Sequence, residues 1–523
     1  MNSISGATFV PHSLTAPDYL CLGLYFAINL AIGWWCRKRS RRSSTSFFLG
    51  SGRVVWWAAA VSFFATSVSS ISFMALPAKS FQGDWLAVGS APAQSLAGMV
   101  TGFVFVGIFR RLNMTTVFDY LERRFDRRVR YFGAGLAILL KVVGRMSIVM
   151  LLPALALATV TGLNVYVSIL LMGVITTIYA MEGGFEAVVW TDVLQTIVMV
   201  GGVTIAIHHI AAGVPGSFSG IVDTASAAGK FHAVSWDLDV TKPTVWVFIG
   251  MFFATLFFQI SDQPLMQRML ATADERDAKR TVTIGNFIGL LSGFVFFFVG
   301  TALWTFYRAH PERLAPTLSG DAIFPYFIVN ELPHGVVGLI IAGLFAAAMG
   351  ALSSMLNSSA TVIVSDFYDT LRPNQPTATR TRLAWWVTLA CGFVATGMAL
   401  FLAWRNVPSL WDEFLRLAAL IGGGFPGVFA LGLLTRRANG PGVCVGAIAS
   451  IVFTWWVQTY TSTSVFFHTF LAIACTMVIG YVTSLFFAPR GPARNLRGLT
   501  VWDFAAAQTP ATPAKSPLTA SSS

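Results

Sequence analysis

Charged residues are scarce in this chain. Of its 523 residues, 11% are Asp, Glu, Lys or Arg and 55% are hydrophobic. A soluble domain usually carries about 25% charged residues, whereas lipid does not penalise exposed apolar surface. The composition therefore excludes a soluble globular protein and indicates a polytopic membrane protein.

Several motifs of other protein classes are also missing. The five cysteines are scattered, and no two have metal-ligand spacing, which argues against a disulfide framework or a zinc site. Neither GxxxxGKS nor GxxxxGKT occurs, so an ion gradient and not ATP is expected to supply energy. No nucleophile or metal constellation appears, so an enzyme is not expected. The first apolar run has no basic segment before it, which predicts a retained span and not a signal peptide.

What the chain does contain is a series of long apolar runs. A helix needs about 20 residues to cross a hydrocarbon core of ~30 Å. Thirteen runs approach or exceed this length: 16–36, 55–77, 85–109, 131–160, 164–180, 187–207, 243–261, 282–305, 335–364, 384–404, 411–434, 441–460 and 466–487. The sequence therefore predicts an all-α protein with thirteen transmembrane helices.

The basic residues support this count. If the N-terminus lies outside and the C-terminus inside, 26 of the 35 Lys and Arg fall in cytoplasmic segments. The outside loops hold only Lys230, Lys242, Arg308, Arg313 and Arg405. Positive charge concentrates on the cytoplasmic side of membrane proteins, against anionic headgroups. The net charge of +12 therefore indicates a lipid bilayer and not nucleic acid as the partner. The protein is expected in the cell (inner) membrane.

Four stretches interrupt the apolar pattern, and the first is FFATSVSSISFMALPAKSF, residues 63–81. Five hydroxyl residues crowd into seven positions, and Pro77 follows them. Small hydroxyl residues can serve close helix packing. The alternative is an unwound helix, whose free carbonyls would face a cation and whose half-helix N-terminus would face an anionic group.

The second stretch is LKVVGRMSI, in which Lys141 and Arg145 lie four residues apart on one helical face. Two unpaired cations deep in a span are costly. Either an acidic side chain pairs with them or an anionic substrate reaches them, and Lys141 could also extend toward the interface.

The third stretch, GGFEAVVWTDVLQTIVMVGG, holds a single ionisable group in its apolar part, Asp192. This carboxylate could be tied to an arginine or could cap a helix start. Alternatively it could be one ligand of a small hard cation, with oxygen partners on a neighbouring helix.

The fourth stretch, residues 344–369, is rich in Ala, Gly and Ser. Its small residues allow close helix approach, and Ser353, Ser354, Asn357 and Ser358 could also supply cation ligands. Together the four stretches predict a buried polar centre.

Five long motifs resemble those of the sodium:solute symporter family: SFFLGSGRVVWWAAAVSFFATSVSS, FDYLERRFDRRVRYF, YAMEGGFEAVVWTDVLQ, SDQPLMQRML and AAAMGALSSMLNSSATVIVSDFYD. The resemblance covers roughly residues 16–487. Within the family the chain is similar to the bacterial sialic acid symporters through WAAAVSFFATSVSSISFMALPAK and VVGR.

This resemblance implies a leucine-transporter-type fold of two inverted five-helix repeats, with the binding centre where the first helix of each repeat is broken. The implied segments are an additional helix and basic loop (1–54), the first repeat (55–207), an outside loop (208–242), the second repeat (243–435), two C-terminal helices (436–489) and a disordered cytoplasmic tail (490–523).

The resemblance also implies two cation sites. The general sodium site would use backbone oxygens of Ala65, Val68 and Ala347. It would also use hydroxyls at two positions that hold Gly350 and Ala351 here, so both side-chain ligands are missing.

The second cation site would use Asp192 with Ser353 and Ser354, which are present. Through this site Asp192 is predicted to bind sodium or to carry a proton.

For the substrate, the resemblance places Ser67, Ser69 and Ser72 around a carboxylate, with Arg145 nearby. A glutamine that sialic acid symporters use for substrate aligns with Ala91, which leaves the class of substrate broader than sialate. The carboxylate could be held by Arg145 in a bidentate fork.

The sequence therefore predicts a cation-coupled symporter that works as a monomer. It would use Na⁺ or H⁺ to import a small organic anion, such as a sialic acid, sugar acid or monocarboxylate, by alternating access. The alternatives are a proton-coupled or uncoupled carrier or exchanger of a neutral sugar-like solute, and a transporter-like sensor.

Overall fold

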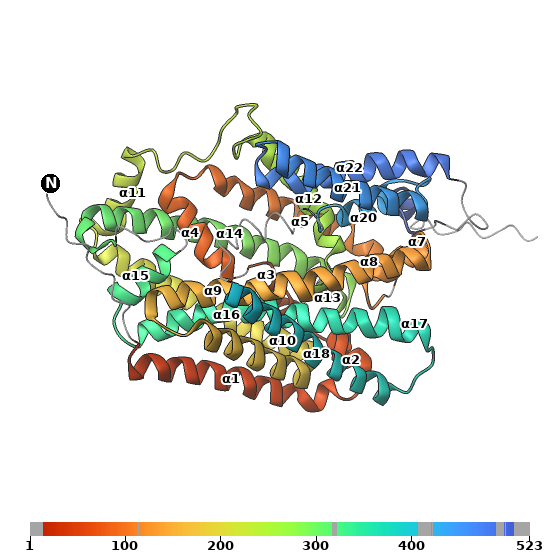
Figure 1. Cartoon of the computed structure of the whole chain (residues 1–523), viewed down its shortest axis with the longest axis horizontal. Coiled ribbons are helices and arrows are strands. Elements are labelled where there is room, and N and C mark those ends of the chain that lie inside the picture. The colour runs from red at the N-terminus through yellow and green to blue at the C-terminus, as the bar shows by residue number, and fades with distance from the viewer. Residues whose placement is uncertain are drawn as a thin grey trace, which may run out of the picture.

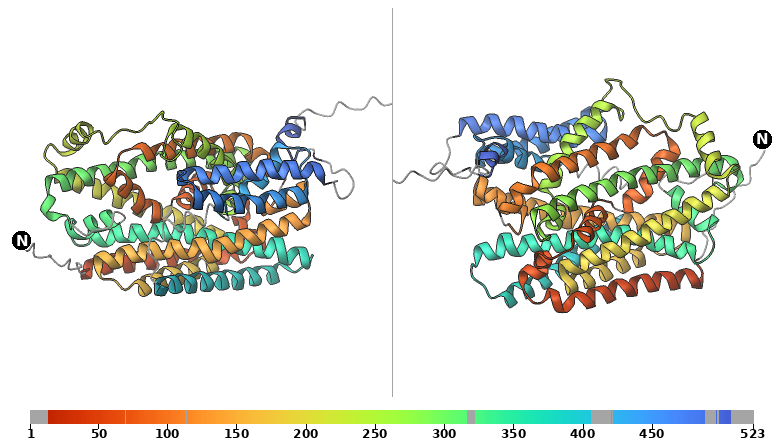
Figure 2. Two further views of the ribbon diagram at one scale, coloured as in Figure 1. Left: turned by 45° about the horizontal axis from the view of Figure 1, so that its top comes forward. Right: turned by 180° about the vertical axis from the view of Figure 1, so that it is seen from behind.

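The computed structural model describes residues 14–68, 70–112, 114–315, 322–405, 420, 422–487, 496 and 498–506. Within these residues the chain forms helices and the loops that join them. The long helices lie side by side along the longest axis of the molecule, with α1 at one edge and α21 and α22 at the opposite edge (Figures 1 and 2). This confirms the predicted all-α architecture.

The helices of the first half are α1 (Ala16–Ser40), α2 (Ser44–Leu49), α3 (Trp56–Ser67), α4 (Ser70–Gln82), α5 (Ser90–Val104), α6 (Val106–Arg111), α7 (Val117–Arg124), α8 (Arg127–Leu139), the π-helix η3 (Leu140–Arg145), α9 (Met146–Thr161), α10 (Val165–Ala212) and α11 (Ser217–Ala227). Short 3₁₀ turns at Gly50–Gly52 and Leu86–Gly89 join some of them.

The helices of the second half are α12 (Val245–Ser261), α13 (Gln263–Leu270), α14 (Glu275–Ala309), α15 (Ile323–Glu331), α16 (Val336–Val362), the π-helix η6 (Ile363–Tyr368), α17 (Asp369–Leu371), α18 (Thr377–Arg405), α20 (Phe425–Leu434), α21 (Gly440–Tyr460), α22 (Val465–Phe486) and α23 (Val501–Ala506). A 3₁₀ turn lies at Pro311–Arg313.

Two spans are broken near their middle. The axes of Trp56–Ser67 and Ser72–Gln82 meet at 58°, and those of α12 and α13 meet at 63°. The backbone is extended at each break, at Val68 (φ −90°, ψ 132°) and at Asp262 (φ −89°, ψ 107°). The unwound helix expected in the first polar stretch is therefore present, and a second one accompanies it.

Helix α16 runs through the middle of the molecule. All of its residues from Ile340 to Val362 are buried. It packs on α10, and a Cβ added to Gly343 would lie 3.5 Å from the Cα of Met199 on that helix. The fourth polar stretch begins at the next residue, and a Cβ on its Gly350 would lie 3.2 Å from the Asp192 carboxylate of α10, so small residues of this stretch do allow close helix approach.

The number of spans differs from the predicted thirteen. Eight helices of the described residues are long and apolar enough to cross a membrane, or ten if each bent pair is one span. Helix α10 is counted once here, although the non-helical backbone of Gly184 (φ 57°, ψ −152°) divides it into two helices that correspond to the predicted spans 164–180 and 187–207. Helix α5 has only 15 residues, and much of the predicted span 411–434 lies outside the described residues.

Candidate substrate and cation sites

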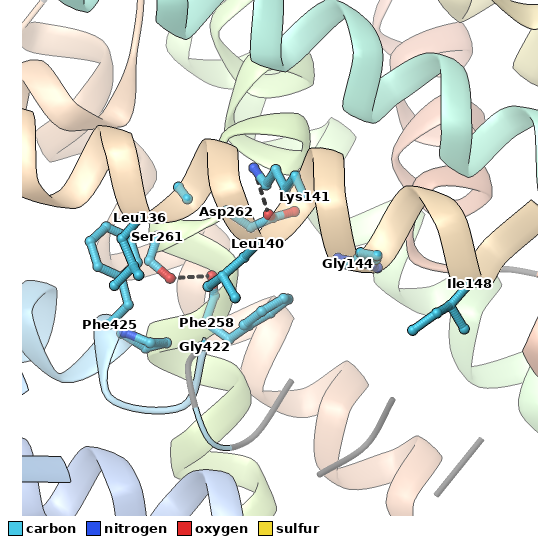
Figure 3. Close-up of a pocket in the computed structure, with 13 residues that line it drawn as sticks. Leu136, Leu140, Lys141, Gly144, Ile148, Phe258, Ser261, Asp262, Gly422 and Phe425 are labelled. Carbon is cyan, nitrogen blue, oxygen red and sulfur yellow. Dashed lines mark hydrogen bonds and ion pairs between the residues drawn. The ribbon is translucent and has the colours of Figure 1, made fainter. Parts of the chain in front are cut away.

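Two cavities lie beside the broken helices. The first, of about 300 Å³, lies between η3, α12 and the start of α20 and is called the Lys141 cavity here (Figure 3). The second, of about 230 Å³, lies between α3, α4, α5 and α14 and is called the Ser67 cavity. Three residues, Arg145, Phe258 and Asp262, line both. The two cavities therefore adjoin at the break between α12 and α13.

The two deep cations of the sequence have different partners. Lys141 Nζ lies 3.2 Å from the Oδ1 of Asp262, at the break (Figure 3). The side chain of Arg145 makes no hydrogen bond or ion pair with any of the described residues. Both belong to the π-helix η3, and such one-turn π segments within α-helices recur at functional sites. The acidic partner expected for the cations is thus found for Lys141, and Arg145 stays available to a ligand.

The predicted substrate-binding serines lie beside Arg145 as far as the structure describes them. Ser67 and Ser72 line the Ser67 cavity together with Arg145. The Ser67 hydroxyl donates to the carbonyl of Phe63 at 3.0 Å, so its oxygen can still accept a hydrogen bond. Ser69 lies outside the described residues.

Asp192 is buried in a cluster of polar side chains. Its Oδ2 accepts hydrogen bonds from the Ser62 hydroxyl at 2.5 Å and from the Arg268 guanidinium at 3.1 Å. Neither side chain of this ion pair is exposed. Arg268 also donates to the hydroxyl of Ser354, which in turn lies 3.1 Å from Thr66 Oγ1. The arginine thus bridges Asp192 and Ser354, and the tie to an arginine that the sequence left open is present.

The second carboxylate oxygen of Asp192 has a different environment. Its Oδ1 and the Oε1 of Gln195 are buried and have no hydrogen-bond partner among the described residues. A Cβ on Gly350 would lie 3.2 Å from that Oδ1 and 2.7 Å from that Oε1. Two unpaired oxygens therefore converge on the place where the missing side chain of residue 350 would begin. Unpaired buried oxygens are costly and are an arrangement that a cation would stabilise.

The hydroxyls of the neighbouring serines turn back to their own helix. Ser353 donates to the carbonyl of Gly350 at 3.1 Å, and Ser354 donates to the same carbonyl at 2.8 Å. Their oxygens keep lone pairs that can bind a cation.

The backbone residues predicted for the general sodium site lie at the first break. Ala65 belongs to the last turn of α3, where helical carbonyls lack in-helix donors, and Val68 is the residue that follows the helix. Ala347 lies on buried α16. Ala347 belongs to the hydrophobic core beside the break, Val68 packs against that core, and Ala65 is buried.

Three residues of the polar centre escaped the sequence analysis. Arg268 was counted among the cytoplasmic arginines, yet it is fully buried and lies 76 residues from Asp192 along the chain. Asp262 and Gln195 were treated as parts of motifs only. One signal in the sequence could have found them. The polar stretches and motifs hold two carboxylates and three cations in apolar surroundings, and each carboxylate there needs a cation as its partner.

A helical membrane protein with two broken spans around buried charges is typical of secondary transporters. The model of the sodium:solute symporter family matches residues 47–450, and the chain belongs to this family.

Curated relatives match most of the chain. It is 34% identical to the sodium/sialic acid symporter NanT of Aliivibrio fischeri over 475 residues, which cover 90% of this chain and 93% of that protein. It is 35% identical to the sodium/sialic acid symporter SiaT of Proteus mirabilis over 483 residues, which cover 91% of this chain and 97% of that protein.

Solved structures agree. A substrate-bound, outward-open sodium-coupled sialic acid symporter with a novel sodium site matches with a TM-score of 0.84 and 32% identity, covering 91% of this chain and 99% of that one. Mhp1, a nucleobase–cation symporter, matches with a TM-score of 0.52 at 13% identity over 85% of this chain and 96% of its own, which shows the fold alone.

Membership in this family establishes the general activity. The protein is a sodium-coupled symporter of the cell membrane, with multiple membrane-spanning helices, and it is not an enzyme. Its fold is that of the leucine-transporter-like sodium-coupled transporters.

Proposed function

We propose that this symporter imports a small organic anion, such as a sialic acid, a sugar acid or a monocarboxylate, by alternating access. The observation that carries the proposal is Arg145. Arg145 lines both cavities at the broken helices, and its side chain pairs with no carboxylate among the described residues. Arg145 is half-buried and has no counter-charge among the described residues, and a substrate carboxylate would supply one. The sialic acid symporters that resemble this chain act on an anion of this kind.

We further propose that Asp192, Ser353 and Ser354 bind the coupling sodium ion. The unpaired Oδ1 of Asp192 supports this, since carboxylate oxygen is a strong ligand for a hard cation. Backbone oxygens of Ala65, Val68 and Ala347 would form the general site.

The proposed topology has thirteen helices, with the N-terminus outside and the C-terminus inside. The two inverted repeats cover 55–207 and 243–435. The substrate carboxylate is held by Ser67, Ser69, Ser72 and Arg145. The monomer is the transporting unit, and nucleic acid is not a partner. The basic end of α1 supports the orientation. Arg37 and Arg41 pair with Glu182 at 2.9 and 2.8 Å, so this end of α1 and the kink of α10 lie on one side of the membrane.

The test is uptake of labelled N-acetylneuraminate, gluconate and lactate into proteoliposomes, with sodium and with choline outside. We expect accumulation of at least one of these acids only under a sodium gradient. Arg145→Lys should weaken its binding by about 1–3 kcal/mol, because a point charge does not reproduce a bidentate fork. Arg405→Lys, at the exposed end of α18, is the matched control. Unchanged affinity in both Arg145→Lys and Arg145→Ala would make Arg145 structural and reject the anion assignment.

A further inference from the structure

Few charged side chains line the two cavities, and the positive ones outnumber the negative ones. In the part of the chain that the structure describes, Lys141, Arg145 and Asp262 are the charged residues among those that line either cavity. The other lining residues are apolar, small, hydroxyl or amide side chains. Two cations and one carboxylate therefore face the same space.

The carboxylate is held on one of the two cations. Asp262 Oδ1 lies 3.2 Å from Lys141 Nζ, and their side chains are only 7% and 12% exposed. Figure 3 shows the two side chains facing each other across the gap between η3 and the broken helix. At this distance the charges compensate each other, and Arg145 is left as the uncompensated cation of the described lining.

The broken helix itself favours this arrangement. Asp262 precedes the first residue of α13, and the positive end of a helix dipole stabilises an anion there. Ser261 is the last residue of α12, whose negative end attracts a cation such as Lys141. The two helix ends at the break therefore both favour the Lys141–Asp262 pair.

We propose that the Lys141–Asp262 pair sets the charge of the transported anion. With the pair intact, the lining offers one net positive charge and selects a singly charged acid over a doubly charged one. Asp262 is then a specificity-determining residue, since its charge opposes a second carboxylate. This inference rests on the proposed function, because it assumes that the substrate is an anion.

The physical reason is the poor screening of charge in a buried site. A second carboxylate in the cavity would face Asp262 with little water between them, and like charges in such a place are strongly unfavourable. A merely structural ion pair would hold the broken helix in place without changing which valence of anion binds.

The experiment changes the net charge in both directions on the full-length protein. Two pairs of acids are used, gluconate with glucarate and butyrate with succinate, because each pair has one backbone and differs in carboxylate number. Dissociation constants are measured by isothermal titration in sodium chloride. The wild-type protein should bind the singly charged acid of at least one pair about tenfold or more tightly than its partner.

Three variants give three distinct expectations. Asp262→Asn, which adds one net positive charge, should reduce or invert the preference for the singly charged acid. Lys141→Gln, which removes the net charge, should weaken both acids about tenfold or more. The double variant Lys141→Gln/Asp262→Asn should restore the wild-type preference. Lys279→Gln/Glu275→Gln removes a surface pair of 2.8 Å and should change nothing.

The outcomes separate the two hypotheses. An Asp262→Asn protein with the wild-type preference, or a double variant without it, overturns the role of the pair and leaves the proposed function standing. Wild-type protein that binds none of the four acids, nor N-acetylneuraminate, overturns both. If one single variant does not fold, the other decides, because a merely structural pair would leave both the affinity for the two acids and the preference between them unchanged.

Discussion

At the scale of single residues, the buried polar centre is arranged around Arg268. Its guanidinium donates to Ser62 at 3.0 Å, to the carbonyl of Pro264 at 2.8 Å and to Asp192 at 3.1 Å. This satisfies the arginine but uses only one of the two carboxylate oxygens of Asp192. The cation site proposed at the other oxygen therefore has a positive charge as its neighbour, and sodium must bind in competition with it.

The Asp192→Asn variant should lose sodium-driven accumulation and also lose stability. From the sequence alone, this variant is expected to keep its fold. The structure changes that expectation, because Arg268 would remain fully buried without its counter-charge. Removing one partner of a buried pair costs about 3–5 kcal/mol. Thermal unfolding of the detergent-purified variant measures this loss.

A second substitution separates the two effects of Asp192. Asp192→Asn/Arg268→Met removes both charges, so it should recover stability and still fail to accumulate substrate under a sodium gradient. Sodium-dependent accumulation in either variant would contradict the role of Asp192 as a cation ligand.

At the scale of helices, the breaks and kinks decide which side chains meet. Helix α10 changes direction at Gly184. Asp192 lies about two helical turns after this kink, on a part of α10 that packs against α3 and α16. The kink packs closely on α2: a Cβ on Gly184 would lie 3.0 Å from the carbonyl oxygen of Phe47. At φ 57° and ψ −152° the backbone of Gly184 is also in a region that only glycine adopts readily.

Gly184→Ala should therefore destabilise the protein by about 1–3 kcal/mol. The matched control is Gly201→Ala on the same helix, where a Cβ would meet no atom within 4 Å and the backbone is helical. The control should be neutral or slightly stabilising, since Ala favours helix over Gly. Melting temperatures of the two variants give the comparison, and equal values would contradict a structural requirement for Gly184.

At the scale of the whole molecule, the loop after α11 is tied to the first broken helix. Lys230 Nζ donates to the carbonyls of Ser80, Phe81 and Gly83 at 3.2, 2.8 and 2.6 Å, at the C-terminal end of α4. The cation also lies 4.8 Å from the ring centre of Trp304 on α14. One side chain thus joins the loop after α11 to two helices that flank the Ser67 cavity.

Lys230→Met should lower stability by about 1–3 kcal/mol, because the last carbonyls of α4 would lose a charged donor. Lys242→Met is the control, as the side chain of this lysine is 68% exposed and its Nζ lies 3.7 Å from the carboxylate of Asp239. A melting temperature of Lys230→Met as high as that of the control would show that the loop contact does not stabilise the fold.

The sequence by itself determined the class of protein and the stretches that form its polar centre. Scarce charge and long apolar runs require a membrane protein, because only lipid accepts so much apolar surface. Clustered hydroxyls located the first break, and the isolated charges Lys141, Arg145 and Asp192 marked positions that need partners. The predicted separation of spans 164–180 and 187–207 agrees with the break at Gly184, and the total of thirteen spans stays a prediction because much of 411–434 lies outside the described residues.

Only the tertiary structure decided how these charges pair. Asp192 meets Arg268 at a sequence separation of 76 residues, and Lys141 meets Asp262 across two different helices. Helical periodicity tells which residues share a face, but it does not tell which face of another helix lies opposite. That choice follows from the packing of all the helices, and in particular from the two breaks, which bring Asp262 and Arg268 into the interior. Arg145 was already the predicted ligand of the substrate carboxylate, and the structure added that its neighbour Lys141 is paired with Asp262.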